Sequence, residues 1–176
     1  VFGDAQTIAQ YANNPTIQVH GPGFSKIIIG DDHIERWPEY IEFICSSIIE
    51  NGGRSCINAS AVVVPKYAAE IAEAIAQKLG PVTPTAAEDP GARLSAFANP
   101  AMADGIDAKI EQALSTPGAV DVAAKSRQGS RKAVFEGAVY LQPSIILCDS
   151  FAHPLANTEF LFPYASVVQV PQGNML

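Results

Sequence analysis

Short runs rich in β-branched residues alternate along the chain with longer amphipathic stretches. The runs predict strands that are buried on both faces, because such strands carry nearly continuous apolar sequence. They span residues 26–29, 61–64, 144–147 and 166–170. Between them, isoleucine, leucine and alanine recur at helical spacing, and glycine follows the first two stretches and stops each helix. These stretches predict helices over residues 38–50, 67–79 and 105–114.

The alternation of strands with helices predicts an α/β fold, with a mainly parallel sheet flanked by helices. Residues 80–100 are rich in Pro, Ala and Thr and predict a surface excursion, since too little chain lies on either side for two separate cores. We therefore expect one domain over residues 1–176. The chain begins at Val1 without a methionine, in a stretch typical of a strand end, and this pattern indicates a fragment of a longer protein.

The composition excludes several classes of protein. Apolar residues make up 48% of the chain, which is typical of a packed domain and not of a disordered one. No apolar run approaches the roughly 20 residues of a membrane span, and no signal-peptide pattern opens the chain. The net charge of −7 would repel nucleic acid, and the short basic cluster at residues 125–132 lacks interleaved aromatic residues. We therefore expect neither a membrane nor a nucleic acid as a partner.

The three cysteines, Cys45, Cys56 and Cys148, are spread far apart and form no Cys-x-x-Cys pair. This spacing indicates neither a zinc ribbon nor a disulfide framework, and the simplest setting for it is the reducing cytoplasm. Cys45 belongs to an isoleucine-rich helix and Cys148 ends an apolar strand, so both are expected to be structural. Cys56, in contrast, lies in a short loop between a predicted helix and a predicted strand.

A cysteine in such a loop can be exposed at the end of the sheet, where free backbone N–H groups stabilise a thiolate or a developing oxyanion. A thiolate is well suited to attack an aldehyde carbonyl, because sulfur is strongly nucleophilic and leaves readily from a thioester. From spacing alone a second interpretation of Cys56 stays open, that of a small buried apolar residue at the strand entrance.

Four segments of the chain resemble motifs of the aldehyde dehydrogenase superfamily. Residues 51–59, NGGRSCINA, resemble Asn-x-Gly-Gln-x-Cys-x-x-(Ala/Gly), and residues 159–164, EFLFPY, are similar to Glu-x-Phe-Gly-Pro-Val. Residues 137–144, GAVYLQPS, resemble Gly-x-(Phe/Tyr)-x-x-Pro-Thr, and residues 2–4, FGD, stand where the family has the cofactor-contacting turn Phe-Thr-Gly-Ser. The order and approximate spacing of the motifs extend the resemblance from residue 1 to about residue 171.

The resemblance implies the catalytic domain of such an enzyme, without its nucleotide-binding domain and its C-terminal tail. Cys56 would be the nucleophile, Glu159 would hold the ribose of the nicotinamide half of the cofactor, and Gly3 would lie in the cofactor-contacting turn. The implied activity is oxidation of a small-molecule aldehyde by NAD or NADP, through a cysteine thiohemiacetal and an acyl-enzyme. We expect the isolated domain to be inactive and the full-length enzyme to be a homo-oligomer.

The chain departs from the family where the general-base glutamate is expected. Residues 17–26 contain no carboxylate, whereas the family has Leu-Glu-Leu-Gly-Gly-Lys there. His20 is the nearest residue that could replace the base, because imidazole titrates near neutrality, although a histidine bonded to backbone at a strand end is the favoured interpretation. Arg54 replaces the family's Gln, and Leu161 and Phe162 replace its Phe and Gly. These differences indicate a divergent branch.

Two other patterns resemble binding sites only weakly. Residues 21–23, Gly-Pro-Gly, predict a turn beside the site and not a phosphate loop, because a strand and not a helix follows them. Residues 31–33, Asp-Asp-His, are expected to cap a helix by accepting from its free N–H groups. We expect no metal site.

Three alternative functions remain open. The missing base would suit a coenzyme A-acylating member of the superfamily, which releases the acyl group to a thiol and is readily run as an acyl-CoA reductase. A catalytically silent domain, retained for scaffolding or oligomerisation, predicts that Cys56 reacts no faster with iodoacetamide than Cys45 or Cys148. An unrelated α/β binding domain predicts that Cys56 and Glu159 do not share a cleft.

Overall fold

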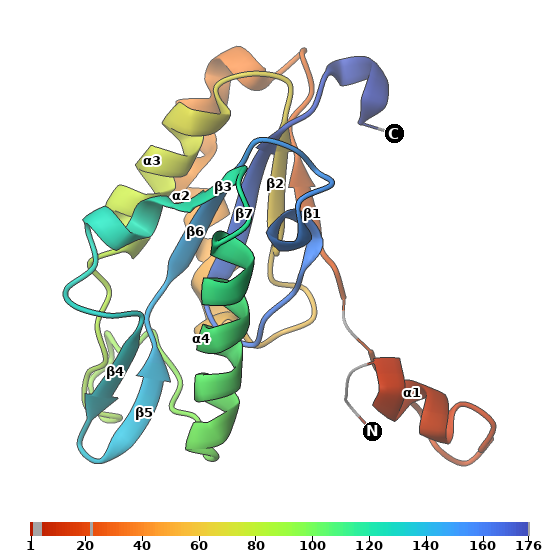
Figure 1. Cartoon of the computed structure of the whole chain (residues 1–176), viewed down its shortest axis with the longest axis vertical. Helices are drawn as coiled ribbons and strands as arrows, with labels where there is room; N and C mark the ends of the chain where they lie inside the picture. Colours follow the sequence, from red (N-terminus) through yellow and green to blue (C-terminus); the bar gives the residue numbers. More distant parts are fainter. Residues whose placement is uncertain (2–4, 22, 176) are drawn as a thin grey trace.

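The computed structural model describes residues 1, 5–21 and 23–175 of the chain. A five-stranded sheet forms its centre, with the strand order β1-β2-β7-β6-β3 (Figure 1). The strands are β1 (Lys26–Ile28), β2 (Ala61–Val64), β7 (Tyr164–Gln169), β6 (Ser144–Cys148) and β3 (Ala119–Asp121). The first four pair in parallel, and β3 pairs antiparallel with β6. The predicted α/β fold with a mainly parallel sheet is confirmed.

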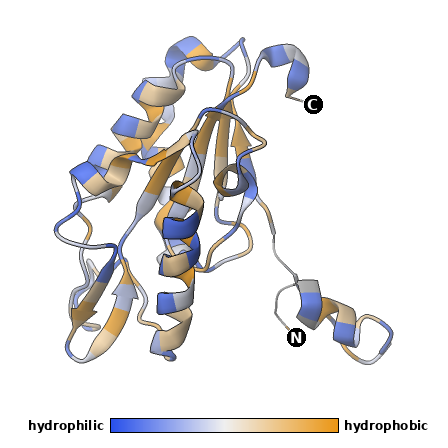
Figure 2. Ribbon diagram, in the orientation of Figure 1, coloured by the Kyte–Doolittle hydropathy of each residue, from blue (hydrophilic) through white to orange (hydrophobic). Residues whose placement is uncertain are grey.

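Helices cover both faces of the sheet. Because successive residues of a strand point to opposite faces, Val62 packs in one buried cluster with α2 (Ile41–Ile49) and α3 (Ala68–Leu79). Val63 packs in a second cluster with α4 (Pro100–Leu114). Figure 2 shows the apolar residues concentrated in the strands between these helices. Burial on both faces is the reason why the strand sequences lack a polar alternation.

The helices begin at other residues than predicted. The helix expected over residues 38–50 is a 3-10 helix, η1 (Ile34–Tyr40), that continues directly into α2. Helix α4 begins earlier than expected, at Pro100, because the Asn99 side chain accepts from the Ala101 N–H at 3.1 Å and proline suits the first helical position. None of the helices in the described residues is long and apolar enough to cross a membrane.

A β-hairpin that the sequence pattern did not predict extends from the sheet. Its strands β4 (Lys132–Phe135) and β5 (Ala138–Leu141) form a separate antiparallel sheet. The turn residues Glu136 and Gly137 have φ angles of 49° and 78°, as two-residue hairpin turns require.

Helix α1 (Ala5–Tyr11) lies apart from the sheet in Figure 1. The remaining 3-10 helices are η2 (Glu50–Gly53), η3 (Val122–Lys125), η4 (Pro154–Asn157) and η5 (Gln172–Asn174).

Two arginines of the basic cluster at residues 125–132 lie in the interior. Arg127 and Arg131 both donate to Oδ2 of Asp121, at 2.8 and 3.2 Å, and the three side chains are at most 5% exposed. Arg131 Nε also donates to the Ser144 hydroxyl at 2.8 Å. Buried charges persist only when they are paired in this way. The cluster therefore fastens β3 and β6 to the segment that enters the hairpin.

Candidate active site

Cys56 lies at the corner of a tight turn between α2 and β2. Two hydrogen bonds close the turn: the Asn58 N–H donates to the Ser55 carbonyl at 2.9 Å, and the Ser55 N–H donates to Asn58 Oδ1 at 2.7 Å. The two corner residues, Cys56 and Ile57, are both exposed, and the Cys56 thiol is free. The interpretation of Cys56 as a small buried residue at the strand entrance is therefore wrong.

Left-handed backbone leads from α2 into this turn. Asn51, Gly52 and Gly53 have φ angles of 52°, 65° and 68°, which confirms the predicted end of the helix. A Cβ atom on Gly53 would overlap the backbone of Phe162, three residues after Glu159. The loop that carries the thiol therefore packs directly on the segment that carries the carboxylate.

A three-residue segment before β1 contacts both predicted site residues. The Phe24 N–H donates to Oε2 of Glu159 at 2.6 Å, although the two residues are 135 positions apart. The Ser25 hydroxyl donates to the Cys56 carbonyl at 2.9 Å. A Cβ atom on Gly23 would overlap the same carbonyl oxygen. The fold thus brings Cys56 and Glu159 to one segment, as a shared site requires.

The other two cysteines are inaccessible. Cys45 is 6% exposed and Cys148 is 2% exposed. Burial raises the pKa of the Cys45 thiol to about 11 and that of the Cys148 thiol to about 12, because a thiolate is poorly solvated in an apolar core. Both side chains therefore stay neutral near pH 7 and pack as small apolar residues. Only the Cys56 thiol reaches solvent.

The surroundings of the thiol and the carboxylate leave hydrogen-bonding capacity unused. Within the part of the chain that the structure describes, the Cys56 N–H donates no hydrogen bond. Such a donor beside a nucleophile is suited to stabilise an oxyanion. Glu159 is half-buried and uses one oxygen for Phe24, whereas a carboxylate offers about four acceptor positions. The remaining positions could take the hydroxyls of a ribose, so the residues present fit a nucleotide cofactor.

Arg54 stands where the motif that the chain resembles has Gln. Its side chain anchors the loop of Cys56 to the segment before α4. Its Nη2 donates to the Ser95 carbonyl at 2.9 Å, and its guanidinium lies over the Phe97 ring, 4.4 Å from the centroid. Burial lowers the pKa of Arg54, and Nε has no partner among the described residues. We infer that this arginine serves the packing of the loop.

The remaining predicted site residues are only partly described. Gly3 and Pro22 lie outside the described residues, so the expected cofactor-contacting turn and the middle of the Gly-Pro-Gly turn are not seen. His20 is exposed, in the segment between α1 and β1, and its backbone N–H donates to the Val1 carbonyl at 2.8 Å. His20 lies three positions before Gly23, and the Gly23 backbone packs on the Cys56 carbonyl.

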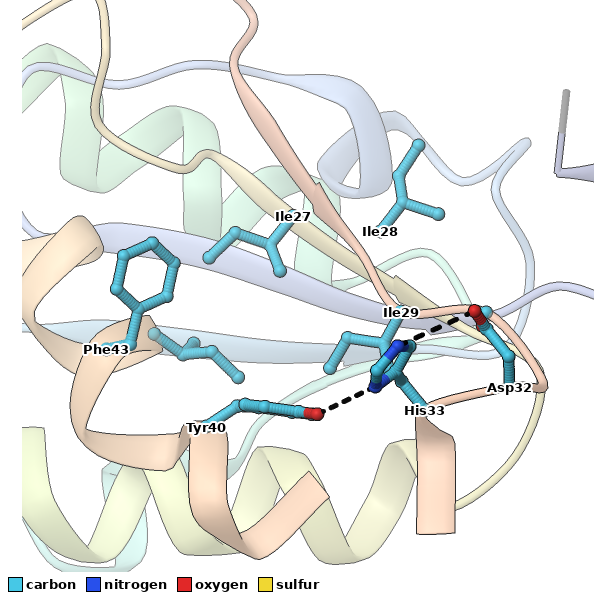
Figure 3. A pocket seen from close by; sticks show the side chains of 9 residues that line it. Ile27, Ile28, Ile29, Asp32, His33, Tyr40 and Phe43 are labelled. Carbon is cyan, nitrogen blue, oxygen red and sulfur yellow. Dashed lines mark hydrogen bonds and ion pairs between the residues drawn. The ribbon is translucent and has the colours of Figure 1, made fainter. Parts of the chain in front are cut away.

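The cluster at residues 31–33 does not cap a helix as predicted. His33 precedes η1, but its side chain makes no capping hydrogen bond. Its Nδ1 lies 3.0 Å from the Tyr40 hydroxyl and its Nε2 lies 3.6 Å from Asp32 Oδ2 (Figure 3). These side chains border a cavity of about 360 Å³ that Cys56 and Glu159 do not line. The described residues contain no group of three side chains that could hold a metal ion.

Two residues that shape the site, Asn58 and Ser25, were not identified from the sequence. Asn58 has a local signal, because asparagine commonly closes turns through its side chain. Ser25 has none, since its contact with Cys56 joins segments 31 residues apart. Gly23, in contrast, belongs to the turn expected beside the site, and its backbone does approach Cys56 closely. Only the three-dimensional structure shows that Asn58 and Ser25 belong to the site.

No protein-family model matches the chain, and no curated protein matches it in sequence. Solved structures nevertheless share its fold. The NAD+ complex of an aldehyde dehydrogenase from Bacillus cereus superposes with a TM-score of 0.74 at 18% identity, over 98% of this chain and 35% of that chain. A mutant of aldehyde dehydrogenase C from Pseudomonas syringae, in complex with NAD+ and octanal, gives 0.75 at 19%, over 96% and 35%.

An NADP-dependent enzyme from E. coli superposes equally well, with a TM-score of 0.74 at 19% identity, over 96% of this chain and 34% of that chain. The chain thus spans about a third of the length of the structures that it matches. At these identities the likeness establishes the fold. The predicted resemblance to the catalytic domain of aldehyde dehydrogenases is confirmed at that level.

Proposed function

We propose that the chain is the catalytic domain of a longer, NAD(P)+-dependent aldehyde dehydrogenase in which Cys56 is the nucleophile. One observation carries the proposal: an exposed thiol and a half-buried carboxylate are anchored by adjacent residues, Ser25 on Cys56 and Phe24 on Glu159. The shared fold and the motifs around Cys56 and Glu159 support it.

The Cys56 thiolate attacks the carbonyl carbon of the aldehyde, a C–S bond forms, and the carbonyl π electrons move to the oxygen. The unused Cys56 N–H donates to the resulting thiohemiacetal oxyanion and lowers the barrier. A hydride then leaves the same carbon, the C=O bond is restored, and a thioester remains on Cys56. When bound, NAD+ or NADP+ supplies the two-electron acceptor for this hydride.

Glu159 orients the cofactor by accepting hydrogen bonds from its ribose. Phe24 holds the carboxylate in place through its N–H, so little side-chain freedom is lost when the ribose binds. A positioning role of this kind affects both the affinity for the cofactor and the rate of hydride transfer.

Large apolar side chains beside the two site residues are exposed. Phe24 is 47%, Ile57 76% and Leu161 45% exposed. We propose that the nucleotide-binding domain of the same protein and the aldehyde cover them, because such patches mark interaction surfaces. The isolated chain would therefore be folded but inactive. Homo-oligomerisation of the full-length protein and a cytoplasmic location remain predictions.

Release of the acyl group is the step for which a second candidate function exists. Residues 17–26 carry no carboxylate that could activate water, and transfer of the acyl group to coenzyme A needs no such base. His20 is the remaining candidate base, and we expect a His20→Ala variant of the full-length protein to keep its turnover. Mass spectrometry of the product, free acid or acyl-CoA, separates the two functions.

Formation of reduced nicotinamide by the full-length protein tests the proposal. We expect Cys56→Ala to lower kcat at least a thousandfold, since the other two cysteines of this chain, Cys45 and Cys148, are buried and cannot form the thioester. Glu159→Gln should lower kcat/KM for the cofactor roughly ten- to a hundredfold, the usual effect of weakening a charged hydrogen bond. The control Cys148→Ala removes a buried thiol and should keep its activity. Full activity of Cys56→Ala would refute the proposal.

A further inference from the structure

Both polar atoms of the Asn58 side chain are hydrogen-bonded, one to the turn of Cys56 and the other to the end of helix α2. Oδ1 accepts from the Ser55 N–H at 2.7 Å, and Nδ2 donates to the carbonyls of Ser47 and Glu50 at 2.8 and 3.0 Å. One side chain therefore joins the two ends of the turn and also binds that turn to the end of α2. The motif resemblance gives position 58 no role.

The end of α2 leaves carbonyl groups without helical donors. The chain leaves the helix through the left-handed residues Asn51 and Gly52, so no further helical turn reaches the carbonyls of Ser47 and Glu50. The Asn58 amide donates to both of them, and the Ala59 N–H also donates to the Ser47 carbonyl, at 3.2 Å. Helix α2 is itself fixed in the core by its buried isoleucines, Ile41, Ile44, Ile48 and Ile49. The turn is thus attached to a rigid support.

We propose that Asn58 is a positioning residue that holds the Cys56 thiol in register with the aldehyde and the cofactor; the inference rests on the proposed role of Cys56 as nucleophile. Reacting atoms must stay within near-attack range, and a displacement of about 1 Å costs roughly a hundredfold in rate. Without the Asn58 side chain, the turn would keep the backbone bond to Ser55 and the contact of Ser25 with the Cys56 carbonyl. It would lose both side-chain bonds to α2 and keep the backbone bond from the Ala59 N–H to the Ser47 carbonyl.

Two substitutions in the full-length protein separate the bonds that Asn58 makes. Asn58→Leu has a similar volume and removes all three side-chain hydrogen bonds. Asn58→Asp keeps the acceptor for Ser55 and removes the two donations to α2. We expect Asn58→Leu to lower kcat ten- to a hundredfold and to speed hydrogen exchange of the Ser55 N–H at least tenfold. Asn58→Asp should lower kcat severalfold while the Ser55 N–H stays protected. NAD+ affinity should stay within twofold in both.

Ser126→Ala is the matched control. The Ser126 hydroxyl donates to the Ala76 carbonyl near the end of α3 at 2.9 Å, which is the same kind of bond at a place remote in sequence from Cys56. Its kcat should stay within twofold of wild type, and an equal loss of kcat in Ser126→Ala would show that Asn58 acts only through stability and would overturn the inference.

Values of kcat within twofold of wild type for both Asn58 variants would also overturn the inference. Where Asn58→Leu does not fold, Asn58→Asp alone decides. Full activity of Cys56→Ala would refute the proposed function separately. In that case the exchange rates of the Ser55 N–H still decide whether Asn58 holds the turn.

Discussion

Gly53 lies directly against the backbone of Phe162, so that a Cβ atom at position 53 would overlap the Phe162 carbonyl carbon. The φ angle of 68° at Gly53 adds a second requirement for glycine, because L-residues are strained there. This contact joins the loop of Cys56 to the segment of Glu159. The close packing of these two segments therefore requires glycine at position 53.

A Gly53→Ala variant should lose about 2–5 kcal/mol of unfolding free energy, as the sum of a left-handed backbone and an overpacked contact. Gly129→Ala is the control, since Gly129 has a φ angle of 82° but nothing within 4 Å of its Cβ position. It should lose only about 1–2 kcal/mol. Urea titration measures both, and equal losses would show that the contact with Phe162 is unimportant.

Iodoacetamide should label Cys56 in the native chain and leave Cys45 and Cys148 unlabelled. Burial and the raised pKa values of the two core thiols, about 11 and about 12, remove both the access and the thiolate that alkylation needs. Peptide mass mapping after a short exposure measures the result. Comparable native-state labelling of Cys45 or Cys148 would contradict their burial.

Replacement of Arg131 should be strongly destabilising. Its side chain is 4% exposed and pairs with the buried Asp121 and the partly exposed Asp107. Arg131→Met therefore leaves the Asp121 carboxylate partly uncompensated and should cost about 3–5 kcal/mol. Lys78→Met removes the exposed pair with Glu42 and should cost much less. Urea titration of the two variants compares them, and similar losses would show that the buried pairs do not stabilise the fold.

The free energy of unfolding should fall with alkaline pH. The folded state keeps Cys45 and Cys148 protonated up to pKa values of about 11 and about 12, whereas unfolded thiols lose their protons near pH 9. The stabilisation is therefore complete below about pH 9 and is lost as the pH rises through the folded values. Burial raises the pKa of the Tyr164 hydroxyl and acts in the same direction.

Urea titrations between pH 8 and 11 measure this fall. A Cys45→Ala/Cys148→Ala double variant should show a smaller decrease over the same range, because the two buried thiols no longer contribute. Tyr164 and Tyr67, whose pKa values are also raised, still contribute. An unchanged slope in the double variant would refute the assignment to the thiols.

The sequence predicted the elements whose pattern reflects burial on both faces. Strands β2 and β6 were located within a residue because a short, continuous β-branched run is typical of a strand between two layers of helices. The hairpin was missed because β4 alternates exposed and half-buried residues over only four positions, from Lys132 to Phe135. Its turn, Glu136-Gly137, also lacks the Asn-Gly or Asp-Gly pair that marks such turns.

The candidate site was predictable only where local motifs carried it. Cys56 and Glu159 stand in segments that resemble family motifs, and the loop before Cys56 contains the glycines that its left-handed backbone needs. The contacts of residues 23–25 with both site residues join distant segments and leave no periodic trace in the sequence. The ion pairs of Arg131 are equally invisible, since burial of a charge depends on the tertiary fold.

In the proposed reaction, Cys56 carries the acyl group during turnover. The most direct measurement is peptide mass mapping of the full-length protein, quenched with acid while it oxidises an aldehyde in the presence of NAD+ or NADP+. We predict an acyl adduct on the peptide that contains Cys56, and no adduct without the cofactor. Sustained turnover with Cys56 unmodified, or with the acyl group on another residue, would contradict the account.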